Sequence, residues 1–189
     1  MASAPIPLLT PERYLELDSR ADRPSEYYDG EMFVIEAASA RHCEIQLNLG
    51  SVLRDQLRNS DCRALGSPLR VRIPRGRYTY PDMVAACNPE YEEDDTLLNP
   101  VCVFEILSES TANFDLGRKF DMYRSIPSLM EYVVIEQHRA SIRRYTRQPG
   151  PKWVLEEFSG MDAALTLHSL GCQVPLSELY LHVDLDPET

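Results

Sequence analysis

The sequence lacks the features that would place it in several specialised classes of protein. No apolar run approaches the roughly 18 residues that a membrane span requires, and the first seven residues have neither the basic start nor the apolar core of a secretory signal. No repeat or linker divides the 189 residues. We therefore expect a cytoplasmic protein without a membrane span, in which residues 1–189 fold as a single domain with a sizeable core.

Metal-binding cysteine pairs and an excess of positive charge are also missing. The five cysteines include no C-x-x-C pair, so we expect reduced, mostly buried thiols, with Cys102 in the core. The 19 Lys and Arg residues are outnumbered by 30 Asp and Glu residues, which gives a net charge of −11. This balance argues against tight nucleic-acid binding by the domain as a whole, but it leaves room for a local basic groove.

Charged residues cluster in three short segments. Arginine is concentrated at 70–77 and 141–147, where it alternates with other residues as on the solvent-facing side of a strand. The acidic run at 90–95 is typical of a solvated loop. None of the three segments by itself indicates a functional site.

One stretch, VCVFEIL at 101–107, raises a functional question. Its six apolar residues, rich in β-branched types, indicate a strand buried on both faces. Glu105 stands in the middle of this run. Because an ionised and unpartnered carboxylate is costly in a protein interior, Glu105 must be neutral, ion-paired or bound to a cation.

Local signals predict the elements around this strand. Turn residues, helix caps and apolar periodicity indicate helices at 10–20, 39–59 and 115–124, a hairpin turning at Asp29-Gly30, and a short C-terminal helix to about 182. Strands are expected at 69–73, 79–87 (entered through Pro81), 131–135, 140–146 and 152–157, with a polar loop at 88–100.

The order of these elements predicts an α/β fold. A strand at 101–107, a helix and a strand at 131–135 suggest a right-handed crossover between parallel neighbours. We expect a mixed central β-sheet flanked by helices, with an N-terminal helix and hairpin and a C-terminal antiparallel extension.

A second carboxylate interrupts the apolar pattern. Asp82 follows Pro81 at the head of an apolar run and precedes Glu105 by 23 positions. If the two strands pair, these carboxylates either share a proton or bind a hard cation such as Mg²⁺ or Mn²⁺. On the helix that follows, Lys119 shares a face with Tyr123 and with Asp115, so Asp115 and Lys119 could also form a surface ion pair worth about 0.3–0.5 kcal/mol.

Together these residues resemble a bacterial family of putative restriction endonucleases within the PD-(D/E)xK nuclease superfamily. The ordered matches are Glu26-Tyr-Tyr-Asp-Gly-Glu31, Ser39-x-x-His42, Pro81-Asp82, Glu105-Ile106-Leu107-Ser108, Ser110-Thr111, Asp115-x-x-x-Lys119, Tyr123 and Pro127-x-x-x-Glu131-Tyr132. They cover about residues 10–180, where the resemblance places a restriction-endonuclease-like core. A Pro-Asp dipeptide alone is weak evidence, whereas the ordered set is fairly specific.

The resemblance implies a metal-dependent endonuclease that hydrolyses phosphodiester bonds in DNA. Asp82 and Glu105, with the backbone carbonyl of Ile106, would bind Mg²⁺ or Mn²⁺. The superfamily's lysine should stand two residues after the glutamate, but that position is Leu107. In this family the lysine is thought to come from the following helix, and Lys119 is the matching residue, with a catalytic role.

Two further residues are catalytic candidates on weaker grounds. Glu26 would approach the metal from the N-terminal side, or it is a carboxylate at the edge of the hairpin. His42, early in its helix, would lie at the cleft and bind or shuttle protons, or it has a structural role.

Two functions from different classes remain open. One is the endonuclease, which would hold DNA weakly or locally because of its acidic net charge. A homodimer would let two sites address two strands, although nothing in the sequence shows one. The other is a catalytically inactive protein of the same fold that acts as a binding or assembly module, which the net charge and Leu107 favour.

Overall fold

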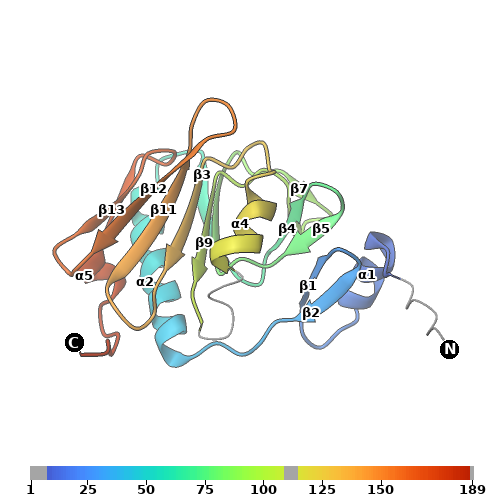
Figure 1. The fold of residues 1–189 in the computed structure, drawn as a ribbon, viewed down its shortest axis with the longest axis horizontal. Coiled ribbons are helices and arrows are strands. Elements are labelled where there is room, and N and C mark those ends of the chain that lie inside the picture. The colour runs from blue at the N-terminus through green and yellow to red at the C-terminus, as the bar shows by residue number, and fades with distance from the viewer. Residues whose placement is uncertain (1–7, 109–114, 188–189) are drawn as a thin grey trace.

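The framework of the protein consists of two six-stranded sheets and one two-stranded sheet (Figure 1). The computed structural model describes residues 8–108 and 115–187, with only the backbone described at 115 and 116. The sheet that carries the candidate site, here called the central sheet, has the strand order β12-β11-β10-β9-β6-β3. In chain order its strands are β3 (Cys62–Gly66), β6 (Met83–Cys87), β9 (Cys102–Ile106), β10 (Glu131–Ile135), β11 (Ser141–Arg147) and β12 (Trp153–Ser159).

A second sheet, with the order β2-β1-β5-β4-β8-β7, flanks the central sheet (Figure 1). Its strands are β1 (Ser25–Tyr28), β2 (Glu31–Val34), β4 (Arg70–Ile73), β5 (Arg77–Thr79), β7 (Tyr91–Glu92) and β8 (Thr96–Leu97). The two-stranded sheet pairs β13 (Ala164–Leu167) with β14 (Cys172–Pro175). The second sheet is the largest feature that the sequence patterns did not predict.

The helices are short except for one. They are α1 (Pro11–Asp18), α2 (Ala40–Gln56), the π-helix η1 (Asp115–Lys119) continued by α4 (Phe120–Tyr123), and α5 (Leu176–Leu179). The side chains of Thr10 and Ser39 cap α1 and α2, so the two predicted helix starts are confirmed. No helix within the described ranges is long and apolar enough to cross a membrane.

Two apolar cores cover the two faces of the central sheet. On one face, Ile45 and Leu49 of α2 pack with Phe104 of β9. On the other face, Val103 packs with Tyr123 of α4 and with residues of the second sheet. Because side chains alternate along a strand, Glu105 lies on the same face as Val103 and points toward α4.

The predicted connections in the second half of the chain are confirmed. β9 and β10 pair in parallel, with Glu105 opposite Val134, and η1 and α4 lie between them in the chain. β10, β11 and β12 continue as an antiparallel extension. The β1–β2 hairpin turns at Asp29 and Gly30, which both have positive φ (55° and 87°) as a two-residue turn requires.

The single strand expected at 79–87 is wrong. The chain leaves the second sheet after β5 at Thr79 and enters the central sheet with β6 at Met83. Pro81 lies in the connection, where its missing N–H interrupts no strand ladder. The division matters for function because it places Asp82 at the point where the chain passes from one sheet to the other.

Two of the expectations about charged segments also need correction. Arg70 and Arg144, assigned to solvent-facing positions, are 8% and 1% exposed. Arg144 is ion-paired with Glu156 and lies 3.8 Å from the buried Glu131. The segment at 88–100 contains the short strands β7 and β8.

The expectation of reduced cysteines is wrong for one pair. Cys62 and Cys87 stand opposite each other on β3 and β6 and form a disulfide. Cys102 and Cys172 are free and buried, as expected, whereas Cys43 is free and exposed.

Candidate active site

A cavity of about 580 Å³ opens where the first turns of α2, the β1–β2 hairpin and the ends of β6 and β9 meet. It is lined by all five residues that the sequence proposed as catalytic: Glu26, His42, Asp82, Glu105 and Lys119. Ile106, the proposed carbonyl ligand, lines it as well. We refer to this space as the carboxylate cavity. Residues from five separate parts of the chain therefore meet at one place.

The two strand carboxylates are neighbours across the sheet. The β6–β9 ladder ends with Met83 opposite Phe104. Asp82 directly precedes β6 and lies beside the end of β9, where its Oδ2 accepts from the backbone N–H of Ile106. Glu105 points toward Tyr123 of α4, whereas the Asp82 carboxylate contacts His42 of α2 and the backbone of Ile106.

Asp82 is held through its carboxylate and its backbone. Its Oδ2 accepts a hydrogen bond from the backbone N–H of Ile106 at 2.7 Å, and its Oδ1 lies 2.9 Å from Nε2 of His42. Its carbonyl oxygen accepts from Nε2 of Gln46 at 2.7 Å. The side chains of α2 thus fix Asp82 from one side and the β9 backbone fixes it from the other.

Glu105 is ion-paired, which answers the question raised by its strand. Its Oε1 lies 3.0 Å from Nζ of Lys119 and accepts a hydrogen bond from the Tyr123 hydroxyl at 2.8 Å. The same Nζ lies 3.0 Å from Oε1 of Glu26. Lys119 therefore bridges two carboxylates, one from each sheet, in a position where its own side chain is only 9% exposed.

Lys119 and Tyr123 reach Glu105 from one helical segment, η1 followed by α4. Their spacing of four residues places them on one face, as predicted. Lys119 is buried and not at the surface, and its pairing with Asp115 is untested. The Asp115 side chain, Ser110 and Thr111 lie outside the described residues.

Tyr123 remains a hydrogen-bond donor to this group. Burial raises the pKa of its hydroxyl well above the usual value, and the nearby charge of Glu105 acts in the same direction. A protonated hydroxyl donates its hydrogen bond to the carboxylate, and a donated hydrogen bond favours the ionised form of a carboxylate. The sequence placed Tyr123 on the correct face but assigned it no role.

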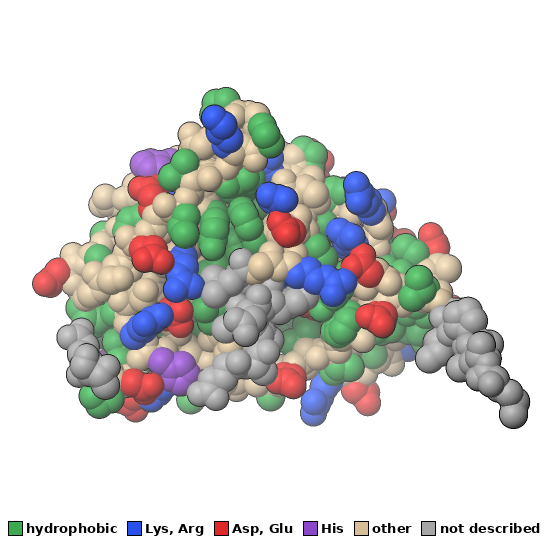
Figure 2. All heavy atoms as spheres, in the orientation of Figure 1, with side chains coloured by type: hydrophobic (Ala, Val, Ile, Leu, Met, Phe, Trp, Pro, Cys, Tyr) green, Lys and Arg blue, Asp and Glu red, His purple; other side chains and the backbone are tan. Residues whose placement is uncertain are grey.

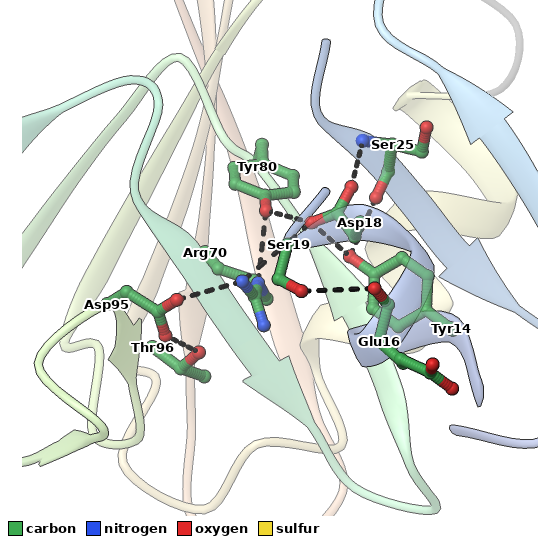
Figure 3. A network of polar contacts seen from close by, with 9 residues as sticks. All are labelled: Tyr14, Glu16, Asp18, Ser19, Ser25, Arg70, Tyr80, Asp95 and Thr96. Atoms are coloured by element: carbon green, nitrogen blue, oxygen red, sulfur yellow. Dashed lines mark hydrogen bonds and ion pairs between the residues drawn. The ribbon is translucent and has the colours of Figure 1, made fainter. Parts of the chain in front are cut away.

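A buried polar network, which the sequence did not reveal, includes Tyr80 of the cavity lining; Figure 3 shows its contacts. The Tyr80 hydroxyl donates to the Asp18 carboxylate and accepts from Nε of Arg70 at 3.0 Å. The Asp18 carboxylate also accepts from the backbone N–H of Ser25 at 2.7 Å. The Arg70 guanidinium also forms an ion pair with Asp95 at 2.9 Å.

This network acts on the residues next to two of the candidates. Ser25 directly precedes Glu26, and Tyr80 stands two positions before Asp82. The backbone N–H of Tyr80 also lies 3.4 Å from Oε1 of Glu26. The Asp18 network therefore positions one carboxylate of each sheet relative to the other.

Between about pH 10 and 12, the protein is expected to lose about 2–3 kcal/mol of stability through Tyr80. Burial, with the hydrogen bond to Asp18, raises the pKa of Tyr80 from 10.0 to about 12. In this range the unfolded chain releases the proton and the folded protein keeps it. The contribution is therefore complete below pH 10 and is lost as the pH rises through 12.

Urea unfolding of the wild type and of Tyr80→Phe at a series of pH values measures this effect. The stability advantage of the wild type over the variant should fall by about 2–3 kcal/mol across the range. A difference that stays constant from pH 9 to 12 would show that Tyr80 does not titrate as proposed.

The ligand atoms in the carboxylate cavity are oxygens, which is the ligand type that a hard divalent cation prefers. Asp82 and Glu105 supply carboxylate oxygens from adjacent strands, and the Ile106 carbonyl would add a third oxygen, the ligand type that Mg²⁺ and Mn²⁺ prefer. Within residues 8–108 and 115–187, no group of three or more His, Cys, Asp or Glu side chains is arranged to hold a metal ion. A bound cation would therefore depend on backbone or water oxygens and would compete with Lys119 for Glu105.

The fold of the protein is restriction-endonuclease-like. The solved structure of a putative nuclease belonging to DUF820 from Anabaena variabilis ATCC 29413 aligns with a TM-score of 0.75, over 91% of this chain and 97% of that chain, at 19% identity. At this identity, the alignment establishes the fold.

The family follows from the sequence match. The family described as "Putative restriction endonuclease" (Uma2) matches residues 11–177, so the chain belongs to it. Two uncharacterized proteins of Synechocystis sp. are similar along nearly their whole length: one is 30% identical, with 94% of each chain covered, and the other is 33% identical, with 87% of this chain and 96% of that one covered. Family membership supports a nuclease-like function.

Proposed function

We propose that the protein is a metal-dependent endonuclease that hydrolyses phosphodiester bonds in DNA. The observation that supports this proposal is the convergence of Asp82, Glu105 and Lys119 in one cavity of a restriction-endonuclease-like fold. Asp82, Glu105 and the Ile106 carbonyl would hold Mg²⁺ or Mn²⁺. When bound, the ion would supply a Lewis acid for the phosphate and lower the pKa of a bound water.

The side chains around the cation site have separate tasks in this mechanism. The Lys119 ammonium positions the attacking water or stabilises the negative charge that develops on the phosphate. Tyr123 holds the Glu105 carboxylate in place through its hydrogen bond. His42 orients Asp82 and can carry a proton at Nε2. Glu26 orients Lys119 from the second sheet.

Asp82→Ala is expected to reduce Mg²⁺-dependent or Mn²⁺-dependent nicking of plasmid and single-stranded DNA by about 100-fold or more, because it removes a metal ligand and the partner of His42. Asp55→Ala is the matched control, since Asp55 is an exposed aspartate on α2 that pairs only with Arg58 among the described residues. Nicking that is equal in the wild type and in Asp82→Ala would show that the assigned site is wrong.

A second candidate function has a specific observation in its favour. Lys119 already forms ion pairs with both Glu26 and Glu105, so the buried Glu105 has a positive partner without a cation. An inactive protein of the same fold that acts as a binding or assembly module would need this ion pairing but no metal ion. Titration calorimetry separates the two: binding of Mg²⁺ or Mn²⁺ that is lost in Asp82→Ala favours the nuclease, and no binding at millimolar concentration favours the module.

Two sites can address the two strands of a duplex. A homodimer would supply them, and we propose this state for the DNA-bound protein. The mass in solution with and without a short duplex tests it, since a protein that stays monomeric at saturating duplex would exclude paired sites.

A further inference from the structure

A second pocket, of about 410 Å³, lies beside α4, and four of its lining residues are arginines. Its charged and aromatic lining residues are Arg75, Arg77, Asp121, Arg124, Arg147 and Trp153. We refer to it as the arginine pocket. Four positive charges and one negative charge meet here, in a chain whose net charge is −11. The local basic groove that the composition left open is therefore present at this place.

Arg147 is held in the arginine pocket by hydrogen bonds to backbone carbonyls. Its Nε donates to the carbonyl of Leu129 at 2.6 Å, and its Nη2 donates to the carbonyls of Arg124 and Ile126 at 2.8 Å each. Its guanidinium carbon lies 4.6 Å from the centre of the Trp153 ring. Backbone carbonyls carry no net negative charge, so Arg147 keeps its positive charge for a ligand.

Two arginines at the rim can reach a ligand. Arg75 is exposed at the β4–β5 turn and makes no ion pair within the part of the chain that the structure describes. Arg124 pairs with Asp121 three residues earlier, but both side chains are about half exposed or more, at 49% and 63%. Exposed pairs of this kind contribute at most about 1 kcal/mol, so an anion can replace Asp121 as the partner of Arg124.

Aromatic side chains continue from the arginine pocket. The ring of Phe120 packs edge-on against that of Trp153, with ring centres 5.3 Å apart. The centres of the Phe120 and Tyr145 rings are 4.4 Å apart. All three rings are partly exposed. Arginines that track a phosphate backbone beside partly exposed aromatic rings are the combination by which proteins bind nucleic-acid strands. A site for a small free anion would need no such rings.

Basic residues also lead from the arginine pocket toward the carboxylate cavity. Arg77 lines the pocket and pairs with Asp29 at 2.8 Å. Arg118 pairs with the other oxygen of Asp29, and its guanidinium lies 5.3 Å from the centre of the Tyr28 ring, which lines the cavity. On the face shown in Figure 2, Lys and Arg side chains gather over α4 and the β4–β5 region, with acidic side chains between them.

We propose that the arginine pocket binds the phosphodiester backbone of a nucleic-acid strand that extends to the carboxylate cavity. The phosphate contacts come from Arg75, Arg124 and Arg147, and Trp153 with its aromatic neighbours contacts the adjoining nucleotide. The direction toward the cavity rests on the proposed nuclease function. Binding at the pocket does not, because none of its residues belongs to the catalytic group.

The experiment uses the only tryptophan of the chain as a reporter, because Trp153 lies in the arginine pocket. A single-stranded oligonucleotide is titrated into the full-length protein in EDTA, so that no metal is present and no cleavage occurs. Tryptophan emission and the anisotropy of a labelled oligonucleotide are followed at several salt concentrations. The test variant is Arg75→Ala/Arg124→Ala. The control, Arg20→Ala/Arg58→Ala, removes two arginines that are 75% and 72% exposed and that also pair with acidic residues on their own helical segments.

We expect oligonucleotide binding to change the Trp153 emission. The test variant should bind about tenfold more weakly, with a salt slope reduced by about two. The control should change affinity by less than twofold. Equal weakening in both variants would assign the effect to net charge and overturn the proposal, as would anisotropy that rises without any change in emission.

Two further arms separate the alternatives. If inorganic phosphate alone changes the emission at the same concentration of phosphate groups, the pocket is a free-anion site and the proposal fails. If Asp82→Ala abolishes nicking but leaves oligonucleotide binding intact, both proposals stand. If no variant and no metal ion supports nicking while binding persists, the nuclease proposal fails and the pocket remains.

Discussion

Replacing Lys119 with methionine is expected to lower the free energy of unfolding by about 3–5 kcal/mol at neutral pH. Its Nζ lies 3.0 Å from carboxylate oxygens of both Glu26 and Glu105. Without it, Glu105, which is 3% exposed, loses the ammonium that lies 3.0 Å from its Oε1, while the Glu26 carboxylate stays nearby. Urea unfolding measures the loss. Lys152→Met is the control, because Lys152 is the other lysine of the chain and is exposed in the β11–β12 turn, and it should change stability by less than about 0.5 kcal/mol.

The double variant Lys119→Met/Glu105→Gln separates a structural from a catalytic role of the lysine. Removing the uncompensated charge should restore at least half of the lost stability, since the two residues are coupled through one ion pair. The restored protein should still be unable to cleave DNA, because the proposed mechanism needs both side chains. A Lys119→Met variant as stable as the wild type would show that Glu105 does not depend on this ion pair, and a fully active one would remove Lys119 from the mechanism.

Much of the fold was predictable because its signals are local. Thr10, Ser39 and Asp29-Gly30 act through hydrogen bonds and backbone angles within a few residues, so they define two helix starts and a hairpin wherever the segments lie. Long apolar strands such as 102–106 and 131–135 are equally clear. The two-residue strands β7 and β8 carry no pattern of their own and exist only because β4 lies beside them.

The burial of arginines was not predictable for a different reason. Alternation along a strand tells which residues share a face, but not what covers that face. Arg70 stands between Leu69 and Val71, as a surface arginine would, whereas Arg144 follows Arg143 and shares a face with Ile142. They are buried because Asp18 and Tyr80 cover the first, and Glu131 and Glu156 lie against the second.

The residues of the candidate site also divide into those that the sequence predicted and those that it did not. Asp82 and Glu105 stood out because a carboxylate in an apolar strand is costly, and the register of β6 and β9 then brought them together. Lys119 was indicated by the family resemblance. Asp18, Arg70 and Tyr80 could not be joined in advance, because their contacts arise only when α1 and the second sheet pack together.

Replacing Arg70 with methionine is expected to destabilise the protein by about 3 kcal/mol or more. The Arg70 guanidinium lies 3.7 Å from the carboxylate of Asp18, whose side chain is only 2% exposed, and donates to the Tyr80 hydroxyl. Methionine fills a similar volume but leaves Asp18 buried without a positive charge. Chemical unfolding of the variant at neutral pH measures the cost.

The same strand offers the matched control. Arg72 stands two residues along β4 and is also ion-paired, with Glu92 at 3.0 Å, but both side chains are more than two-fifths exposed. Arg72→Met should therefore cost no more than about 1 kcal/mol. Adding Asp18→Asn to Arg70→Met should recover part of the loss, because an amide needs no counter-charge. Equal losses of stability in Arg70→Met and Arg72→Met would show that burial does not determine how much the Asp18 network contributes to stability. The network would then not be what holds Ser25 and Tyr80 in position. The same would apply to Glu26 and Asp82, which follow them closely in the chain.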